Sequence, residues 1–132
     1  SSGDHTDTLR KNQSKDPALV GTWGRIITET SGSGPAIQVY RFEIRNVFYP
    51  DGSCGTGTGK KFIAGQPNVP EGKDIVIRKD ELTGWYTKDN RIYFIEKKGK
   101  HGILYSVRYR ISGNRLLLTN DRGKETLFIR RN

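Results

Sequence analysis

The segment DGSCGTGTGKK at residues 51–61 has the residue types of a phosphate-binding loop, in which a glycine-rich turn presents backbone N–H groups to phosphate oxygens. A P-loop requires G-x-x-x-x-G-K-[S/T] between a strand and a helix. Counting back from Gly59 and Lys60, the first glycine position holds Cys54, and the hydroxyl position holds Lys61. The next residues, FIAGQPNVPEG, cannot begin a long helix because of their prolines and glycines. These residues therefore argue against a nucleotide site of this kind.

The other residues with catalytic chemistry are few and scattered. Cys54 is the single cysteine, and it would be a nucleophile only beside a histidine. His5 and His101 fall in a polar tail and in a turn, so we expect Cys54 to be a buried or half-buried structural thiol. Asp80 and Glu81 are adjacent, and neighbouring residues of a strand point to opposite faces. With no metal-ligand cluster either, we expect a protein that is not an enzyme and has no cofactor or metal.

The elements that must position any binding residues are predicted to be β-strands. From Leu19 onward, short strand-like segments alternate with turn signals, and the tight turns after residue 80 favour antiparallel neighbours. Eight or nine strands in up-and-down order are best closed into a barrel, because closure removes exposed edges. We predict a flexible polar tether at residues 1–16 and one small all-β, antiparallel up-and-down barrel at residues 17–132. The segment KDE at residues 79–81 is expected to interrupt two strands, IVIR and LTGWYT.

Alternation gives the glycines of SCGTGTG a structural interpretation. Gly55, Gly57 and Gly59 share one strand face, and Cys54 lies on the other. A glycine face weakens a strand unless something large lies against it or the sheet bends there. We expect large aromatic side chains to cover this face; the candidates are Trp23, Tyr40, Phe42, Trp85 and Tyr86.

Positive charge is concentrated in the second half of the chain. The net charge is +9, and residues 75–132 hold 14 Lys/Arg against 6 Asp/Glu. We expect Arg108 and Arg110 to lie on the outer face of a strand and to steer the protein toward acidic partners or an anionic envelope surface. Nucleic acid is not expected as the partner, since Tyr109 would point inward and single-strand binding needs aromatic and basic side chains on one face.

Several short motifs together resemble the lipocalin-like domains of small bacterial cell-envelope lipoproteins. The resemblance covers about residues 19–132, although G-x-W also opens avidins and fatty-acid-binding proteins. It rests on Gly21-Thr22-Trp23, Tyr40-x-Phe42 before Asp51-Gly52, Gly84-Trp85-Tyr86, Tyr109-x-Ile111-x-Gly113-Asn114-x-Leu116-x-Leu118, and a terminal arginine.

The resemblance implies an extracytoplasmic protein, at the cell envelope or secreted, with a lipidated cysteine directly before Ser1 as its only link to a membrane. An expression scar is the alternative origin of the first three residues. It also implies that Trp23 packs under an arginine of the last strand, Arg130 or Arg131, and so closes one end of the barrel as a structural plug.

The barrel interior is expected to be filled by side chains instead of holding a ligand. Bulky residues are expected to point inward, and eight strands enclose a space that side chains can just fill. A carrier of a small hydrophobic ligand is the alternative, in which the glycines create an open barrel. The expected interior residues are Trp23, Phe42, Trp85, Val107, Tyr109 and Leu117.

A filled barrel favours recognition of a protein partner through loops. The segment AGQPNVPEGKD carries Pro67 and Pro70, which bias it toward a stiff, extended backbone that a protease cleft can accept with little loss of entropy. In size and barrel type the chain is similar to small bacterial protease inhibitors, the staphostatins and the potempins. The partner is therefore predicted to be a protein, in the sharpest form a peptidase, although an ordinary crossover loop is the alternative. The candidate binding residues are Gln66, Pro67, Asn68, Val69, Pro70 and Glu71.

Overall fold

The computed structural model describes residues 14–65, 75–100 and 102–131, and within them the protein is a nine-stranded antiparallel sheet. One short 3₁₀ helix, η1 (Gly34–Ala36), joins the first two strands. The described residues contain no helix long and apolar enough to cross a membrane. The strands are β1 (Gly21–Ser31), β2 (Gln38–Phe48), β3 (Ser53–Thr58), β4 (Phe62–Ile63), β5 (Arg78–Lys88), β6 (Arg91–Glu96), β7 (Ile103–Ser112), β8 (Arg115–Thr119) and β9 (Glu125–Arg130).

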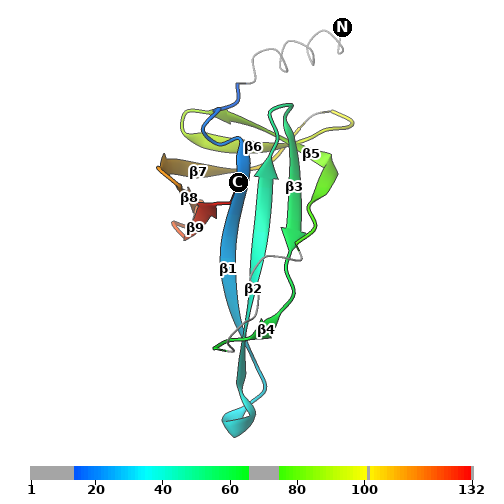
Figure 1. The fold of residues 1–132 in the computed structure, drawn as a ribbon. Helices are drawn as coiled ribbons and strands as arrows, with labels where there is room; N and C mark the ends of the chain where they lie inside the picture. The colour runs from blue at the N-terminus through cyan, green and yellow to red at the C-terminus, as the bar shows by residue number, and fades with distance from the viewer. Residues whose placement is uncertain (1–13, 66–74, 101, 132) are drawn as a thin grey trace, which may run out of the picture.

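The sheet closes on itself, which confirms the predicted all-β barrel. The strand order is β1-β9-β8-β7-β6-β5-β3-β2, and β2 pairs again with β1 (Figure 1). Of the described strands, only β4 lies outside this circle, as a two-residue strand on the edge of β2. Tight turns connect β5 to β6 and β7 to β8; Asp89 and Asn90 both have positive φ, as a two-residue hairpin of type I′ requires.

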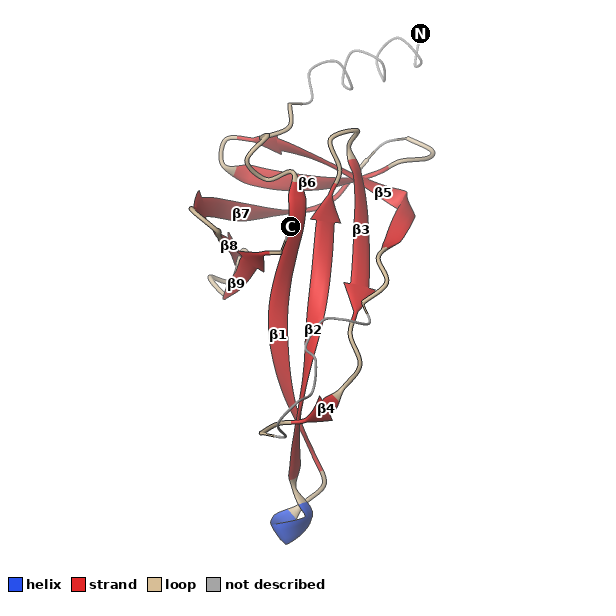
Figure 2. Cartoon of the chain, in the orientation of Figure 1, coloured by secondary structure: helices blue, strands red, loops and turns tan. Residues whose placement is uncertain are grey.

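The β1–β2 hairpin extends well beyond the barrel as an arm. Its two strands pair without interruption from Gly21↔Phe48 to Ser31↔Gln38. Figure 2 shows this ribbon leaving the barrel and ending in η1. The pairing of β1 with β9, by contrast, covers only Trp23 and Gly24. Most of β1 therefore belongs to the arm and not to the barrel wall.

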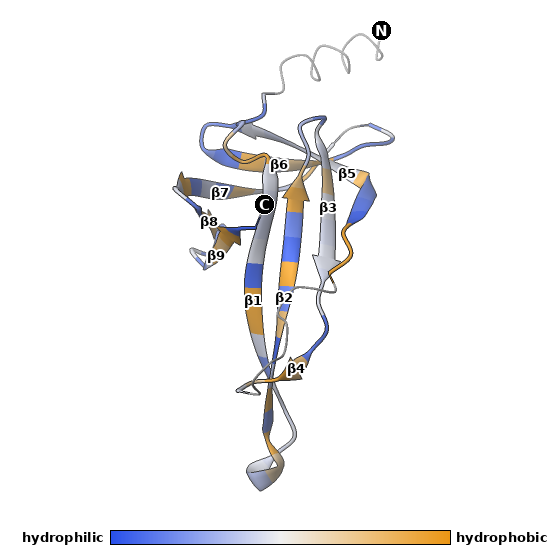
Figure 3. Cartoon of the chain, in the orientation of Figure 1, coloured by the Kyte–Doolittle hydropathy of each residue, from blue (hydrophilic) through white to orange (hydrophobic). Residues whose placement is uncertain are grey.

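The core fills the barrel at one end. Leu19, Trp23, Phe48, Trp85, Ile92, Leu116 and Phe128 form its buried cluster. Hydropathy changes from residue to residue along the strands, notably along β2, as a sheet with two different faces requires (Figure 3). Trp85 is held by its indole N–H, which donates to the carbonyls of Tyr49 (3.1 Å) and Ser53 (3.0 Å).

The predicted interior residues are mostly correct, with two exceptions. Trp23 and Trp85 are fully buried, and Val107 and Tyr109 pack against the core. Phe42 is buried but lies in the arm, opposite Ile27 of β1. Leu117 was wrongly placed: it pairs with Arg110 and Leu127 on the outer face, and its neighbours Leu116 and Leu118 point inward. One residue of register decides which leucines of LLL are inside.

The glycine face of β3 is covered, but not by the aromatic residues that the sequence suggested. A Cβ atom at Gly57 would lie 2.5 Å from the carbonyl oxygen of Val76 and 2.8 Å from a methyl of Ile75. One at Gly55 would lie within 3.2 Å of Ile77 and Tyr49. The chain entering β5 therefore presses its backbone against β3, which is why these positions need glycine.

The expected break at KDE is a register shift inside a continuous strand. Neighbouring residues Ser53 and Cys54 of β3 pair with Gly84 and Asp80 of β5. The intervening N–H groups of Leu82 and Thr83 donate to the Asp80 carboxylate, at 2.8 and 3.1 Å. These bonds hold the pKa of Asp80 below its usual value, chiefly the bond from Leu82. The polar residues thus stabilise a bulge and do not end the strand.

Candidate functional site

The structure leaves the predicted binding loop untested. Gln66, Pro67, Asn68, Val69, Pro70 and Glu71 all lie outside the described residues. The segment expected to be a tether is described only from Ser14 onward. Ser14 bridges to Thr87 of β5, and its hydroxyl donates to the Thr87 carbonyl at 2.8 Å. Residues at the end of that segment therefore contact the barrel.

One end of the barrel is closed by Trp23 and Arg130. The Arg130 guanidinium lies over the Trp23 ring, 4.2 Å from its centroid, so the contact implied by the resemblance is present. Arg130 also donates to the carbonyls of Ala18 (2.7 Å) and Val20 (3.3 Å), and the Trp23 indole N–H donates to Leu19 (2.8 Å). These bonds fasten the turn before β1 across the barrel end and make Trp23 and Arg130 a structural plug.

Arg131, which directly follows β9, has a different role from Arg130, because successive residues of an extended chain face opposite ways. It lies against Gly24, where a Cβ atom would be 2.7 Å from the Arg131 Cγ. Its guanidinium pairs with Glu43 at 3.1 Å, and Arg45 binds the other oxygen of the same carboxylate. Glu43 is only 3% exposed, and both of its oxygens are satisfied by arginine, as a buried carboxylate requires.

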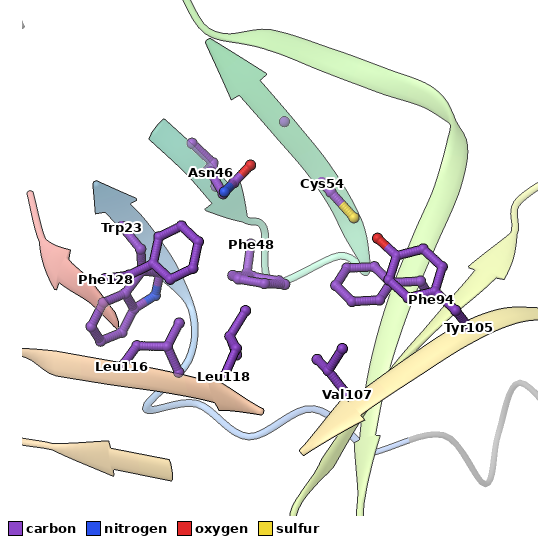
Figure 4. Close-up of a pocket in the computed structure, with 12 residues that line it drawn as sticks. Trp23, Asn46, Phe48, Cys54, Phe94, Tyr105, Val107, Leu116, Leu118 and Phe128 are labelled. Carbon is purple, nitrogen blue, oxygen red and sulfur yellow. The ribbon is translucent and has the colours of Figure 1, made fainter. Parts of the chain in front are cut away.

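A cavity of about 170 Å³ remains inside the barrel, so side chains do not fill it as completely as expected. Figure 4 shows Trp23, Leu116 and Phe128 at one end of this space and Cys54, Phe94 and Tyr105 at the other. Phe94 and Tyr105 are stacked, with centroids 4.6 Å apart. The lining is mainly apolar, and Asn46 and Cys54 supply its polar groups.

The cavity leads toward a second hollow that shares five of its lining residues and is bounded in addition by Thr56, Asp80 and Thr83. Tyr105 is 56% exposed at this point. The barrel is therefore closed at the Trp23 end and accessible at the Tyr105 end. The inner volume is below the roughly 300 to 1,000 Å³ of sites for drug-sized ligands, so its occupant would have to be small.

Cys54 is a structural thiol, as predicted. It lies half-buried on the inner face of β3, and its sulfur is 3.8 Å from the Thr83 carbonyl oxygen. Burial raises the pKa of the Cys54 thiol to about 11, and the nearby Asp80 carboxylate adds to the effect. Because the thiolate is the nucleophile, this environment suppresses its reactivity at neutral pH. Among the described residues there is also no group of histidine, cysteine or carboxylate side chains placed to hold a metal.

The outer face of β5 to β8 carries a row of basic side chains, which we call the cationic face. Inward residues alternate with them: Trp85 and Thr87 on β5, Ile92 on β6, and Leu116 on β8 are buried. Register brings the basic residues together, with Lys88 opposite Arg91 and Arg91 opposite Arg108. The cationic face consists of Lys88, Arg91, Arg108, Arg110 and Arg115.

Most of this charge is not neutralised by acidic side chains of the described residues. Arg91 donates to the Ser106 hydroxyl (3.0 Å) and lies 3.4 Å from a carboxylate oxygen of Asp121. The remaining four residues of the cationic face form no ion pair with any described residue. Between Arg108 and Arg110 the surface has a shallow depression, lined also by Leu117 and Glu125. Arg108 and Arg110 are exposed, and Tyr109 between them packs inward, as predicted.

As predicted, no aromatic side chain lies between Arg108 and Arg110 on the outer face of β7, but the neighbouring strands add a pair of tyrosines to the cationic face. Tyr86 and Tyr93 lie opposite each other on the same outer face and are stacked, with centroids 5.0 Å apart and planes inclined by 10°. Tyr93 is also opposite Ser106, next to Arg91 and Arg108. The sequence pattern of β7 alone could not reveal this, because the two tyrosines come from β5 and β6 and meet only through their register.

Comparison with protein-family models, with curated proteins and with solved structures found no match for this chain. The site must therefore be interpreted from its own geometry. It offers two features to a partner, the cationic face with its tyrosine pair and a small apolar cavity.

Proposed function

We propose that the protein is a non-enzymatic binding protein whose partner is an acidic protein. The observation that carries this proposal is the cationic face, on which four basic side chains without an ion-pair partner among the described residues share the outer surface with the stacked tyrosines. Arginine and tyrosine are enriched at the centres of protein interfaces, where they supply large contact areas and directed hydrogen bonds. An uncompensated charge of this kind also accelerates association with a partner of opposite sign.

In its sharpest form, the partner is a peptidase of the cell envelope or the medium. This proposal rests on the resemblance to lipocalin-like envelope proteins, on the rigid closed barrel, and on the proline-rich segment at residues 66–71. A rigid scaffold limits the entropy lost on binding, which is the physical requirement for a tight inhibitor. The cationic face would then guide the encounter, and the loop would occupy the cleft.

Reversing charge on the cationic face is expected to slow association. The variant Arg108→Glu/Arg110→Glu should reduce the association rate with the captured partner at least tenfold at low salt, because steering of this kind changes rates by factors of about 10 to 10³. Stopped-flow fluorescence or surface plasmon resonance at several salt concentrations measures the effect. Lys98→Glu/Lys100→Glu makes the same change of charge at exposed positions of the β6–β7 turn and serves as the control. Equal association rates for the wild type and the Arg108/Arg110 variant would contradict the proposal.

The cavity favours a second candidate function, the binding of a small apolar molecule. A cavity of comparable size, about 150 Å³, binds benzene or xenon in a protein interior. We expect benzene to shift the NMR signals of residues that line the cavity, and Leu118→Phe to abolish the shifts by filling it. Leu127→Phe, at a position that is 45% exposed on the outer face, is the matched control. Unchanged spectra of the wild type on adding benzene would exclude this function.

A further inference from the structure

The arm has one strand edge whose backbone groups could bind a partner, and this edge belongs neither to the cationic face nor to the cavity. Beyond Gly24, no described strand lies against β1 on the side away from β2. Residues 25–31 therefore present an open strand edge, seven residues long (Figure 2). Natural proteins usually protect such an edge with prolines, bulges or a row of charges. This segment has no proline, its register against β2 is unbroken, and its only charged residues are Arg25 and Glu29.

The direction of each backbone group on this edge follows from the hydrogen bonds of its neighbours. The Arg131 N–H donates to the Thr22 carbonyl at 2.8 Å, so the even-numbered residues of β1 direct their N–H and C=O groups away from β2. On β2, the Glu43 carbonyl accepts from the Gly59 N–H, so the odd-numbered residues of β2 direct their backbone groups away from β1. The even-numbered residues of β2 therefore bond the odd-numbered residues of β1, which leads independently to the same assignment. The groups at the open edge therefore belong to Ile26, Thr28 and Thr30.

The side chains of this segment complement one another when two copies of it lie side by side in antiparallel orientation. In the sequence Arg25-Ile26-Ile27-Thr28-Glu29, a two-fold axis through Ile27 places Arg25 opposite Glu29 and Ile26 opposite Thr28. The pair of Ile26 and Thr28 is also the pair whose backbone groups face the edge, so both would exchange two hydrogen bonds. The charged pairs and the direction of the backbone N–H and C=O groups thus favour the same register. A shift of the axis by one residue would place Glu29 opposite Ile27 and lose both ion pairs.

We infer that a second copy of this chain binds at this edge, as an antiparallel β1–β1 pair over residues 25–29. Ile27 then packs against its symmetry mate, and each Arg25 meets a Glu29. The Arg25 side chain is half-buried and has no ion-pair partner among the described residues. Glu29 already bonds Lys61 at 2.8 Å through one carboxylate oxygen, which leaves the other for Arg25.

The pairing must end after Glu29, because Thr30 would lie opposite Gly24, whose edge β9 already occupies. A five-residue strand pair forms a small interface, so the dimer is expected to be reversible and concentration-dependent. It would join the two arms in antiparallel orientation, with the barrels at opposite ends. This inference does not depend on the proposed function.

A proline substitution on the edge tests which residues of β1 direct their N–H groups toward the second copy. Thr28→Pro removes an N–H that points away from β2, so it should spare the hairpin but raise the dissociation constant of the dimer by more than tenfold. Thr30→Pro removes the next edge N–H, beyond the paired segment, and should leave dimerisation unchanged. Sedimentation velocity over a series of concentrations gives the dissociation constant, and circular dichroism confirms that each variant is folded. A wild type that stays monomeric throughout, or equal effects of the two prolines, would overturn the inference.

A charge exchange tests the register. Arg25→Glu alone and Glu29→Arg alone should each raise the dissociation constant about tenfold, since the two-fold axis changes two cross-strand pairs at once. The double variant Arg25→Glu/Glu29→Arg restores opposite charges across the axis and should dimerise nearly as well as the wild type. Losing the exposed ion pair between Glu29 and Lys61 lowers the stability of the protein only slightly in the variants that replace Glu29. If the double variant dissociates as readily as the single ones, Arg25 and Glu29 are not opposite each other and the proposed register is wrong.

Discussion

Replacing Trp23 with alanine is expected to lower the free energy of unfolding by about 3 to 5 kcal/mol, the usual cost of truncating a large buried aromatic side chain. Trp23 is completely buried and anchors the turn before β1 through Leu19. The change would also leave Arg130 without the ring over which its guanidinium lies. Both the core and the closed end of the barrel would therefore be affected together.

Urea denaturation followed by circular dichroism measures this loss. Leu127→Ala, at a position that is 45% exposed, is a suitable control and should change the free energy of unfolding by no more than about 0.5 kcal/mol. If Trp23→Ala costs less than about 1 kcal/mol, the Trp23–Arg130 contact does not close the barrel in the way described.

The second large effect is expected at the glycine face of β3. Gly57→Ala should destabilise the protein by about 1 to 3 kcal/mol, because the new methyl group would meet the backbone carbonyl of Val76 at 2.5 Å and the chain would have to move. The segment from Ile75 to Ile77 would be displaced from β3. The same denaturation experiment reports the change.

Gly102→Ala provides the matched control, since a Cβ atom there would have no other atom within 4 Å. Its stability should stay the same or rise slightly, because alanine restricts the unfolded chain. Equal stabilities of the two variants would show that the glycines of β3 are not required by close packing.

The local patterns of the chain were sufficient to predict its architecture. Tight turns and alternating residues predicted the antiparallel barrel, and alternation in β7 correctly separated Tyr109 from Arg108 and Arg110. The G-x-W motif led to the contact between Trp23 and Arg130, although these residues are distant in sequence. The turns and the alternation lie within one strand or one turn, so they can be recognised without knowledge of the fold, whereas the Trp23–Arg130 contact was implied only by the resemblance.

Features that depend on register between distant strands could not be predicted. The partners of the β3 glycines come from the chain entering β5, and nothing in SCGTGTG identifies them. The polar residues around Asp80 looked like a loop because their role, stabilising a bulge, requires β3 alongside. The tyrosine pair of the cationic face likewise arises only when β5 and β6 align.

The most direct test of the central proposal is a comparison of what three immobilised proteins retain from the envelope and secreted fractions of the source cells. They are the wild type, Arg108→Glu/Arg110→Glu, and a variant in which residues 66–71 are replaced by a Gly-Ser linker. Mass spectrometry would identify both proteins and small molecules in the eluates. We predict that the wild type retains a stoichiometric acidic protein, that the charge-reversed variant retains much less of it, and that a retained peptidase is inactive and escapes the linker variant. Retention of the same proteins by the wild type and the charge-reversed variant, or of a small molecule alone, would contradict the account.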